Sequence, residues 1–222
     1  MKKKLAILGL SGKVGQTFPP LVKEDSLFTL VPDPLKNNNW EKIDMIIDFS
    51  SPETLEVSIP FVLRYQIPWV LGTTGFSPFQ LQKLETVKET IPLFLSANFS
   101  LGITLLHCLV KNAAKFYPES KKQIVETHHI HKKDQPSGTA LSLKSSLEEA
   151  TIQSFRIGEI VGTHEVLFAT EEETLSLKHI AHSKKVFAKG ALKAAHFLLG
   201  KPAGLYTMQD LFINEQFESC NP

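Results

Sequence analysis

Residues 4–15, KLAILGLSGKVG, run from a short apolar stretch directly into a glycine-rich turn. The turn has the spacing Gly-x-x-Gly-x-x-Gly, with its glycines at Gly9, Gly12 and Gly15. Glycines placed directly after a strand let the backbone approach a pyrophosphate, whose charge is met by free amide groups at the start of the next helix. The spacing lacks the usual second glycine of the dinucleotide fingerprint, so an ordinary tight turn is the alternative. Its position after the first strand of an alternating series favours nucleotide binding.

Four further apolar runs follow within the first hundred residues, each bounded by Gly, Pro, Asp or Ser. They are LFTLV (27–31), DMIIDFS (44–50), PWVLGT (68–73) and PLFLSA (92–97). Nearly continuous apolar character predicts strands that are buried on both faces, as in a parallel sheet. Helices are expected between them, from Ser51-Pro52 and from Ser77-Pro78, where Ser caps the helix and Pro fits its first turn. The alternation predicts an α/β fold with a doubly wound, Rossmann-like sheet whose ligand lies beyond the carboxyl ends of the strands.

The pattern changes after residue 100, where a second domain is expected. A helix over 102–116 and a strand over 121–131 precede a helix that starts near Ser137, and alternating segments at 159–170 and 173–183 predict an antiparallel sheet with one exposed face. An apolar helix over 187–199 follows. We therefore expect a nucleotide-binding domain over 1–101, completed by 185–222, and an inserted α+β substrate-binding and oligomerisation domain over 102–184.

Composition narrows the class of protein. The 222 residues carry a net charge of +1, so no charge excess indicates a nucleic-acid or membrane partner. The longest apolar stretches are far shorter than the ~20 residues of a membrane-spanning helix, and the run after Met1 is too short for a signal peptide. Cys108 and Cys220 form neither a disulfide framework nor a zinc ligand set. These features predict a cytoplasmic protein.

Small and polar residues at three places past the expected strands are candidates for ligand contacts. GTTGF (72–76) and SANFS (96–100) leave room for a flat ring and supply hydrogen-bonding groups, although each is also typical of a turn or a helix cap. Asp33 follows the second strand, where an acid would reach an adenosine ribose, but it fits a turn between Pro32 and Pro34 equally well. Lys13 or Lys36 would suit a 2′-phosphate, unless each is solvated surface.

The stretch ETHHIHKKDQPSGTA (126–140) is the most informative in the chain. A metal cluster of His128, His129 and His131 is disfavoured, because adjacent residues of a strand point to opposite faces and the neighbouring lysines repel a cation. The cluster instead predicts an anion-binding pocket with titratable proton donors: histidines for acid–base chemistry, lysines for charge, and the amides of 137–139 at a helix start for a carboxylate. The alternative is a solvated strand end followed by an ordinary helix cap.

With these residues the chain resembles the dihydrodipicolinate reductase family of the diaminopimelate and lysine pathway. The signature E-[AT]-H-H-x-x-K-x-D-x-P-S-G-T-A is met over residues 126–140. Supporting matches are the glycine turn, Asp48-Phe49-Ser50, Gly72-Thr73-Thr74-Gly75-Phe76, Ala97-Asn98-Phe99-Ser100, Phe187-Ala188-x-Gly190-Ala191 and Gly204-Leu205-Tyr206-x-Met208-x-Asp210. The resemblance covers nearly the whole chain.

The resemblance implies that hydride from NADPH or NADH reduces a cyclic imine dicarboxylate, 4-hydroxy-tetrahydrodipicolinate or its dehydrated form, to tetrahydrodipicolinate. By the same resemblance, His128 is the general acid or base and Lys132 the proton donor, and the substrate carboxylates contact His129, Gly138 and Thr139. The implied cofactor contacts are Gly9, Leu10, Ser11, Gly12, Lys13, Val14, Asp33, Gly72, Thr73, Thr74, Ser96, Ala97, Asn98 and Phe99. The family also implies a homotetramer formed through the central domain. No metal is expected, because the histidines of 128–131 do not share one face of a strand and the neighbouring lysines repel a cation.

Two departures from the family pattern are expected to be visible in the structure. The chain is short, and the missing residues are expected between a helix ending near Ala150 and a strand beginning near Ile157. Pro19-Pro20 is expected to interrupt the first helix, because proline does not fit a helix interior. Two rival functions remain at this point: another nicotinamide-dependent oxidoreductase acting on a related imine or amino acid, and a catalytically idle nucleotide-binding or regulatory protein.

Overall fold

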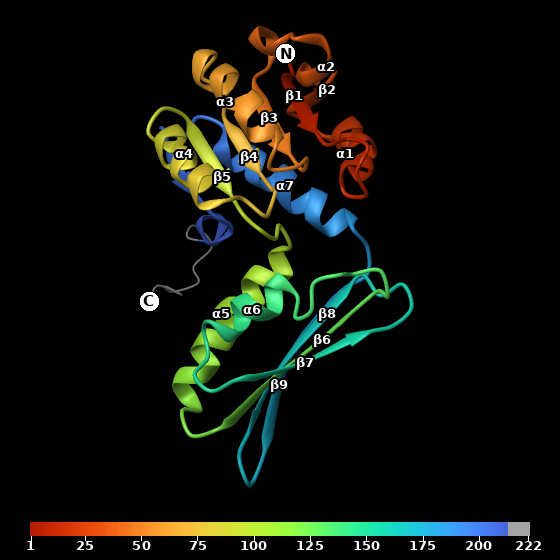
Figure 1. Cartoon of the computed structure of the whole chain (residues 1–222), viewed down its shortest axis with the longest axis vertical. Helices are drawn as coiled ribbons and strands as arrows, with labels where there is room; N and C mark the ends of the chain where they lie inside the picture. The colour runs from red at the N-terminus through yellow and green to blue at the C-terminus, as the bar shows by residue number, and fades with distance from the viewer. Residues whose placement is uncertain (213–222) are drawn as a thin grey trace. The chain divides into compact units, whose positions relative to one another are not determined.

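The computed structural model describes residues 1–212, and its internal contacts divide this part of the chain into two units (Figure 1). The first unit combines Met1–Ser100 with the returning segment from Lys185 onward, and the second comprises Leu101–Lys184. Residues 213–222 of the expected C-terminal return lie outside the described residues.

The first unit is built on a six-stranded sheet of order β10-β5-β4-β3-β1-β2, in which every neighbouring pair is parallel. Its strands are β1 (Lys3–Leu8), β2 (Phe28–Val31), β3 (Met45–Asp48), β4 (Trp69–Leu71), β5 (Pro92–Leu95) and β10 (Gly204–Tyr206). The expected α/β class with a Rossmann-like sheet is confirmed. The chain changes direction across the sheet between β1 and β3, which is where doubly wound folds bind ligands beyond the carboxyl ends.

Helices cover both faces of this sheet because successive residues of a buried strand point to opposite sides. One apolar cluster joins β1, β3, β4 and β5 to α3 (Thr54–Arg64) and α4 (Pro78–Lys88), whereas α7 (Lys185–Leu198) contacts β3, β4, β5 and α1. Ser77 caps α4 through a capping box with Gln80. The remaining short elements are η1 (Gly15–Thr17), α1 (Phe18–Glu24), α2 (Pro34–Asn37), η2 (Trp40–Lys42) and η3 (Met208–Leu211).

The prolines near the first helix do not interrupt it, so that expectation was wrong. Helix α1 begins at Phe18, and Pro19 and Pro20 lie in its first turn. A residue in the first turn needs no backbone N–H for an intrahelical hydrogen bond, which is why proline is tolerated there. Conversely, α3 begins at Thr54, three residues after the expected Ser51 start, and contains Pro60 in its interior.

The second unit is a four-stranded sheet of order β7-β6-β8-β9. Its elements are α5 (Leu101–Phe116), β6 (Lys121–His128), α6 (Gly138–Lys144), β7 (Thr151–Arg156), β8 (Gly162–Ala169) and β9 (Thr174–Ala181). The sheet is mixed rather than purely antiparallel, because β7 pairs parallel to β6 while β8 and β9 pair antiparallel. Strand β7 occupies the place where only a shortened connection was expected.

Helices α5 and α6 pack on one face of this sheet (Figure 1). The apolar cluster between them includes Leu106, Val110 and Leu143 from the helices and Ile124 and Val166 from the strands. Glu126 and His128 continue the same face of β6 toward its carboxyl end, because they follow Ile124 at the two-residue period of a strand. The buried face of the sheet therefore changes from apolar to polar at the end of β6.

Candidate functional site

The glycine turn after β1 is held against the backbone that follows β3. Gly9 has a φ of +80°, and a Cβ atom there would lie 2.3 Å from the carbonyl oxygen of Phe49. A Cβ atom at Gly15 would lie 2.1 Å from the carbonyl oxygen of Gly9, so the turn excludes side chains at both positions. The amide of Gly12 donates to the carbonyl of Gly9 at 3.0 Å. These glycines are required by close backbone approach, as a phosphate-binding turn also requires.

Phe49 contacts three of the loops that were predicted from the sequence to bind a ligand. A Cβ atom at Gly72 would lie 2.7 Å from the Phe49 ring, and the Phe49 and Phe99 ring centroids are 5.4 Å apart. The loops after β4 and β5 thus contact the Phe49 ring, whereas the loop after β1 packs against the Phe49 backbone carbonyl. Phe49 was not among the site residues predicted from the sequence, although it stands directly after a buried strand in Asp48-Phe49-Ser50.

A buried acid, Asp48, ties the loop after β3 to the loop after β4 and was also missed. It is 1% exposed, and its carboxylate accepts hydrogen bonds from the Ser50 amide at 2.9 Å, the Thr73 hydroxyl at 3.1 Å and the Ser50 hydroxyl. Burial raises the pKa of Asp48, against the lowering effect of these hydrogen bonds, and the charge of Asp33 raises it further.

Asp33 itself caps α2, where its carboxylate accepts a hydrogen bond from the Leu35 amide at 2.9 Å. This contact matches the turn interpretation that the sequence left open, and it occupies only one of the two carboxylate oxygens. The two lysines considered for a 2′-phosphate, Lys13 and Lys36, are both exposed.

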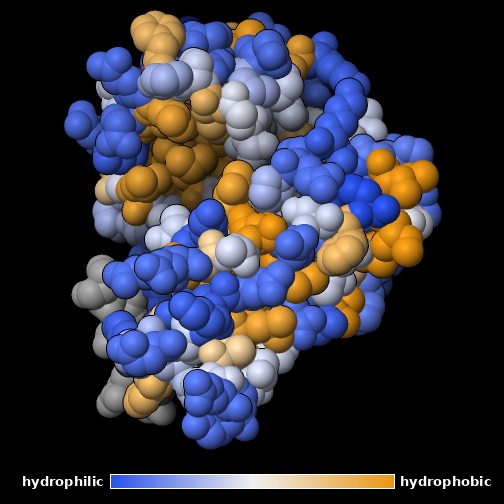
Figure 2. Space-filling view, turned by 60° about the horizontal axis from the view of Figure 1, so that its bottom comes forward, coloured by the Kyte–Doolittle hydropathy of each residue, from blue (hydrophilic) through white to orange (hydrophobic). Residues whose placement is uncertain are grey.

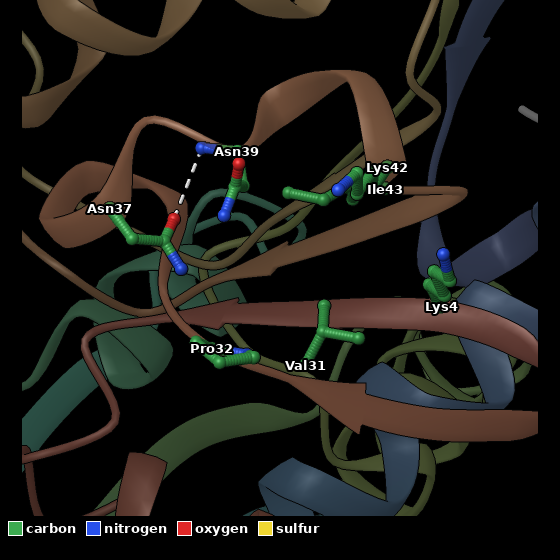
Figure 3. Close-up of a pocket in the computed structure, with 7 residues that line it drawn as sticks. All are labelled: Lys4, Val31, Pro32, Asn37, Asn39, Lys42 and Ile43. Carbon is green, nitrogen blue, oxygen red and sulfur yellow. Dashed lines mark hydrogen bonds between the residues drawn. The ribbon is translucent and has the colours of Figure 1, made fainter.

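A separate hollow of about 140 Å³ lies beside β1, β2 and the segment that runs from α2 through η2 (Figure 3). In Figure 3 the Asn39 amide donates to the Asn37 side chain at 3.1 Å along its rim. None of the nominated cofactor residues is among those that line it: Lys4, Val31, Pro32, Asn37, Asn39, Lys42 and Ile43. The hollow is therefore distinct from the loops that surround Phe49.

In the second unit, a buried charged network forms where β6 ends. Glu126 is fully buried and His128 is 7% exposed. The Oε1 atom of Glu126 accepts hydrogen bonds from the Ser137 amide at 3.2 Å and from Arg156 Nη2 at 2.9 Å, and Oε2 pairs with Nδ1 of His128. Ser137 in turn hydrogen-bonds His164 Nε2 at 3.1 Å and caps α6.

The surroundings of Glu126, His128 and His164 shift their pKa values so that the carboxylate is charged and the two histidines are neutral. Burial alone would raise the pKa of Glu126, but the hydrogen bonds from Arg156, Ser154 and His128 outweigh it, so its pKa lies below the ordinary value. Burial lowers the pKa of His128 by more than the pairing with Glu126 raises it. Burial, with the nearby charge of His128, lowers the pKa of His164 to about 3. At neutral pH the network therefore holds an ionised Glu126 between Arg156 and two neutral histidines.

The remaining nominated residues of this segment lie just beyond the strand. Lys132 is partly buried, and its ammonium donates to Asp134 at 2.8 Å. Gly138 and Thr139 are the first two residues of α6, after the cap at Ser137. His129 follows His128 at the end of β6 and is half-buried.

Ligand-type atoms of Glu126, His128 and His164 lie within 4.8 Å of one another. This set differs from the His128, His129 and His131 cluster that the sequence analysis considered and disfavoured. The Arg156 guanidinium already occupies one oxygen of the carboxylate, and a cation placed there would face that positive charge. The geometry supports a hydrogen-bonded proton network rather than a metal centre.

Comparison with known proteins identifies the family on which this site is built. Residues 3–99 match the family description "Dihydrodipicolinate reductase, N-terminus", and residues 102–212 match "Dihydrodipicolinate reductase, C-terminus". The chain belongs to the dihydrodipicolinate reductase family. The expected oxidoreductase activity, reduction of 4-hydroxy-tetrahydrodipicolinate with NADH or NADPH in lysine and diaminopimelate biosynthesis, is the activity of this family and is confirmed at that level.

Two relatives named 4-hydroxy-tetrahydrodipicolinate reductase illustrate the match. The relative from Caldanaerobacter subterraneus subsp. tengcongensis is 38% identical, with 95% of this chain and 98% of the relative covered. That from Thermosipho africanus is 38% identical over 218 residues, with 96% of this chain and 99% of the relative covered. The Thermosipho relative is thus about as short as this chain.

Among solved structures, the dipicolinate-bound dihydrodipicolinate reductase from Paenisporosarcina sp. TG-14 has the same fold. It superposes with a TM-score of 0.77 at 20% identity, covering 93% of this chain and 98% of that one.

Within residues 1–212, no helix combines the length and the apolar character needed to cross a bilayer.

Glu126 stands in the dihydrodipicolinate reductase signature but no role was predicted for it, and Arg156 and His164 were not predicted as site residues. Arg156 is the Cα partner of His128 in the β6–β7 register, and His164 is the partner of Glu126 in the β6–β8 register. Strand pairing alone brings these side chains together, and no local sequence signal could have revealed it.

Proposed function

We propose that this chain reduces 4-hydroxy-tetrahydrodipicolinate, or its dehydrated cyclic imine, to tetrahydrodipicolinate, with the chemistry carried by the segment from Glu126 to Thr139. The observation that carries the proposal is the pairing of a neutral, buried His128 with an ionised Glu126, followed within a few residues by Lys132 and by the first amides of α6. This segment offers a proton acceptor, a cation and anion-binding amides together.

The first unit serves as the nucleotide-binding domain in this proposal. The close backbone packing at Gly9 and Gly15 is that of a pyrophosphate-binding turn. The loops after β4 and β5, which contact the Phe49 ring, would line the rest of the cofactor. When bound, the reduced nicotinamide supplies a hydride. The residues that would line the cofactor are Gly9, Leu10, Ser11, Gly12, Lys13, Val14, Asp33, Gly72, Thr73, Thr74, Ser96, Ala97, Asn98 and Phe99.

In the second unit the residues manage protons and carboxylates. Hydride added to a carbon conjugated with the imine moves an electron pair onto the ring nitrogen, and a proton must neutralise it. In this proposal Lys132 is the proton donor, and the neutral His128 is the group that accepts or returns a proton. His129 and the amides of Gly138 and Thr139 would hold the substrate carboxylates, which orients the ring.

The cofactor preference is proposed to be dual. Asp33 favours an unphosphorylated ribose by accepting its hydroxyl hydrogen bond and repelling phosphate, whereas the exposed Lys36 can offset that repulsion. Titrations with NADH and NADPH should differ by less than a hundredfold, about 2.7 kcal/mol. A larger difference would contradict dual use.

The open face of the four-stranded sheet supports a homotetramer formed through the second unit. Figure 2 shows apolar side chains gathered in patches on the surface, and the exposed large apolar residues include Phe155 on β7 (53% exposed) and Ile180 on β9 (47% exposed). Both lie on the face of the sheet opposite α5 and α6 by strand alternation. Burial of such a face between subunits would stabilise an assembly.

We also infer a cytoplasmic location, in keeping with biosynthetic use of nicotinamide nucleotides.

The test is a coupled assay with pyruvate, aspartate semialdehyde and the preceding synthase, following the absorbance of NADPH and, in parallel, NADH. Nucleotide oxidation that depends on the synthase is expected. His128→Gln and Lys132→Met should each lower kcat by roughly 10²-fold or more. The matched controls are His131→Gln and Lys133→Met, exposed neighbours that should retain activity.

Other outcomes identify the rival functions. Nucleotide binding without oxidation would indicate an idle or regulatory protein. Oxidation only with another imine or amino acid, in a substrate panel, would indicate a different oxidoreductase. Wild-type kcat in a well-folded His128→Gln or Lys132→Met variant would remove the assigned role from that residue.

A further inference from the structure

The two carboxylate oxygens of Glu126 face different partners, and this arrangement determines which ring nitrogen of His128 carries a proton. Oε1 receives two donors, the Arg156 guanidinium at 2.9 Å and the Ser137 amide at 3.2 Å. Oε2 pairs with the ring nitrogen Nδ1 of His128, and the Ser154 hydroxyl also helps to lower the pKa of this carboxyl. The carboxylate is therefore anchored at one oxygen and presents the other to the imidazole.

An ionised carboxylate can only accept hydrogen bonds, so Nδ1 of His128 must be the donor in this pair. A neutral imidazole carries one proton, and its other nitrogen, Nε2, then holds a free electron pair. The Nε2 edge of the ring lies against Gly162, where a Cβ atom would come within 3.0 Å of Nε2. The absence of a side chain at Gly162 leaves space for this edge.

We propose that Glu126, anchored by Arg156 and Ser137, is a positioning residue that keeps the proton on Nδ1 of His128 and leaves Nε2 as the atom that exchanges a proton with the substrate. The inference rests on the proposed catalytic role of His128. Arg156 acts on His128 indirectly, because its hydrogen bond orients the Glu126 carboxylate.

The substitution Glu126→Gln separates this role from simple packing. The carboxamide oxygen of Gln would remain toward the Arg156 and Ser137 donors, because an NH₂ group there would face two donors. Its NH₂ group would then face Nδ1 of His128 and donate to it. The proton of the ring would move to Nε2, which removes the free electron pair from the reacting atom while side-chain volume and burial are kept.

The experiment combines ring-nitrogen NMR with kinetics on the full-length protein. Histidine labelled with ¹⁵N reports which ring nitrogen carries the proton at about pH 8, where an ordinary histidine is neutral. His128→Gln assigns the His128 signals by their disappearance. The wild type is expected to show a protonated Nδ1, and Glu126→Gln a protonated Nε2, together with a fall in kcat of at least tenfold and KM values within twofold of wild type.

Two control variants bracket this result. Glu172→Gln removes one carboxylate from an exposed position in the turn between β8 and β9 and should leave both the tautomer and kcat unchanged. Glu126→Asp keeps a carboxylate and should keep the proton on Nδ1. If Glu126→Gln fails to fold, the wild-type tautomer and that of Glu126→Asp still decide the matter.

A wild-type His128 protonated on Nε2, or a folded Glu126→Gln variant with wild-type kcat, would overturn the proposal. Failure of the proposed function is distinguishable: the wild type would then show the Nδ1 tautomer but no turnover of the cyclic imine. In that case the positioning of His128 would stand and the substrate assignment would fall.

Discussion

Gly190 lies in α7 where the helix crosses the loop that follows β5. A Cβ atom at this position would lie 1.7 Å from the carbonyl oxygen of Phe99 and 2.8 Å from its carbonyl carbon. An ordinary carbon–oxygen contact is about 3.3 Å, so the helix and the loop would have to separate by about 1.5 Å to accept Gly190→Ala. The obstacle is backbone, and no change of side-chain rotamer can relieve it.

Two effects of opposite sign decide the outcome of Gly190→Ala. Alanine is favoured over glycine inside a helix by about 1 kcal/mol. Overpacking costs about 1–3 kcal/mol, and a rigid backbone partner puts this case near the upper end. We therefore expect the free energy of unfolding to fall by about 2 kcal/mol. Because Phe99 belongs to the proposed cofactor loop, a shift of this loop should also weaken NADPH binding, by about tenfold.

Urea unfolding followed by circular dichroism measures the first effect, and a fluorescence titration with NADPH measures the second. Lys189→Ala is the matched control, because it changes an exposed residue of the same helix without creating a backbone contact. A Gly190→Ala variant as stable as the wild type, or more stable, would mean that helix propensity outweighs the clash and that the packing argument is wrong.

Three further predictions concern other parts of the molecule. Asp25 accepts hydrogen bonds from His196 at 2.6 Å and from two backbone amides, and although burial opposes them, they hold its pKa below the ordinary value. The ionised Asp25 therefore stabilises the fold above about pH 4, and this stabilisation is lost as the pH falls further. In urea unfolding, Asp25→Asn should lower the free energy of unfolding by about 2 kcal/mol at pH 7 and by less near pH 3. An equal loss at both pH values would contradict this prediction. Asp33→Ala should raise the NADPH-to-NADH ratio of kcat/KM while removing a helix cap worth about 1 kcal/mol, and an unchanged ratio would exclude a ribose contact. Ile180→Asp, on the open sheet face, should yield smaller oligomers in light scattering than the wild type, and an unaltered mass would argue against assembly through this face.

The strands of the first unit could be predicted because each is a short apolar run with polar or glycine boundaries. Strand β7 was missed because TIQSFR alternates between partly buried and exposed residues and contains no continuous apolar run. Its parallel pairing with β6 depends on the position of α6 between them in the chain, which is a tertiary feature. The prolines of α1 were misjudged because the helix start was placed too early.

The site was predicted to different depths in the two units. The dense cluster after Glu126 drew attention to His128 and Lys132, because so many titratable groups rarely gather in one segment. Arg156 stands 30 residues from Glu126 and reaches it only through the β6–β7 register. Asp48 ends an apolar run and gave a local signal, but its role in joining two loops depends on Thr73, which lies on the neighbouring strand end.

The return of the chain to the first sheet has a consequence for biosynthesis on the ribosome. Helix α7 and strand β10 complete a sheet whose other five strands are made within the first 95 residues. The nascent nucleotide domain must therefore wait until α7 and β10 have been made, whereas the inserted unit, being contiguous, can fold as soon as Lys184 has left the exit tunnel. The part of the protein synthesised first is then the last to become native, and its exposed edge at β5 is the point most open to chaperones in the interval.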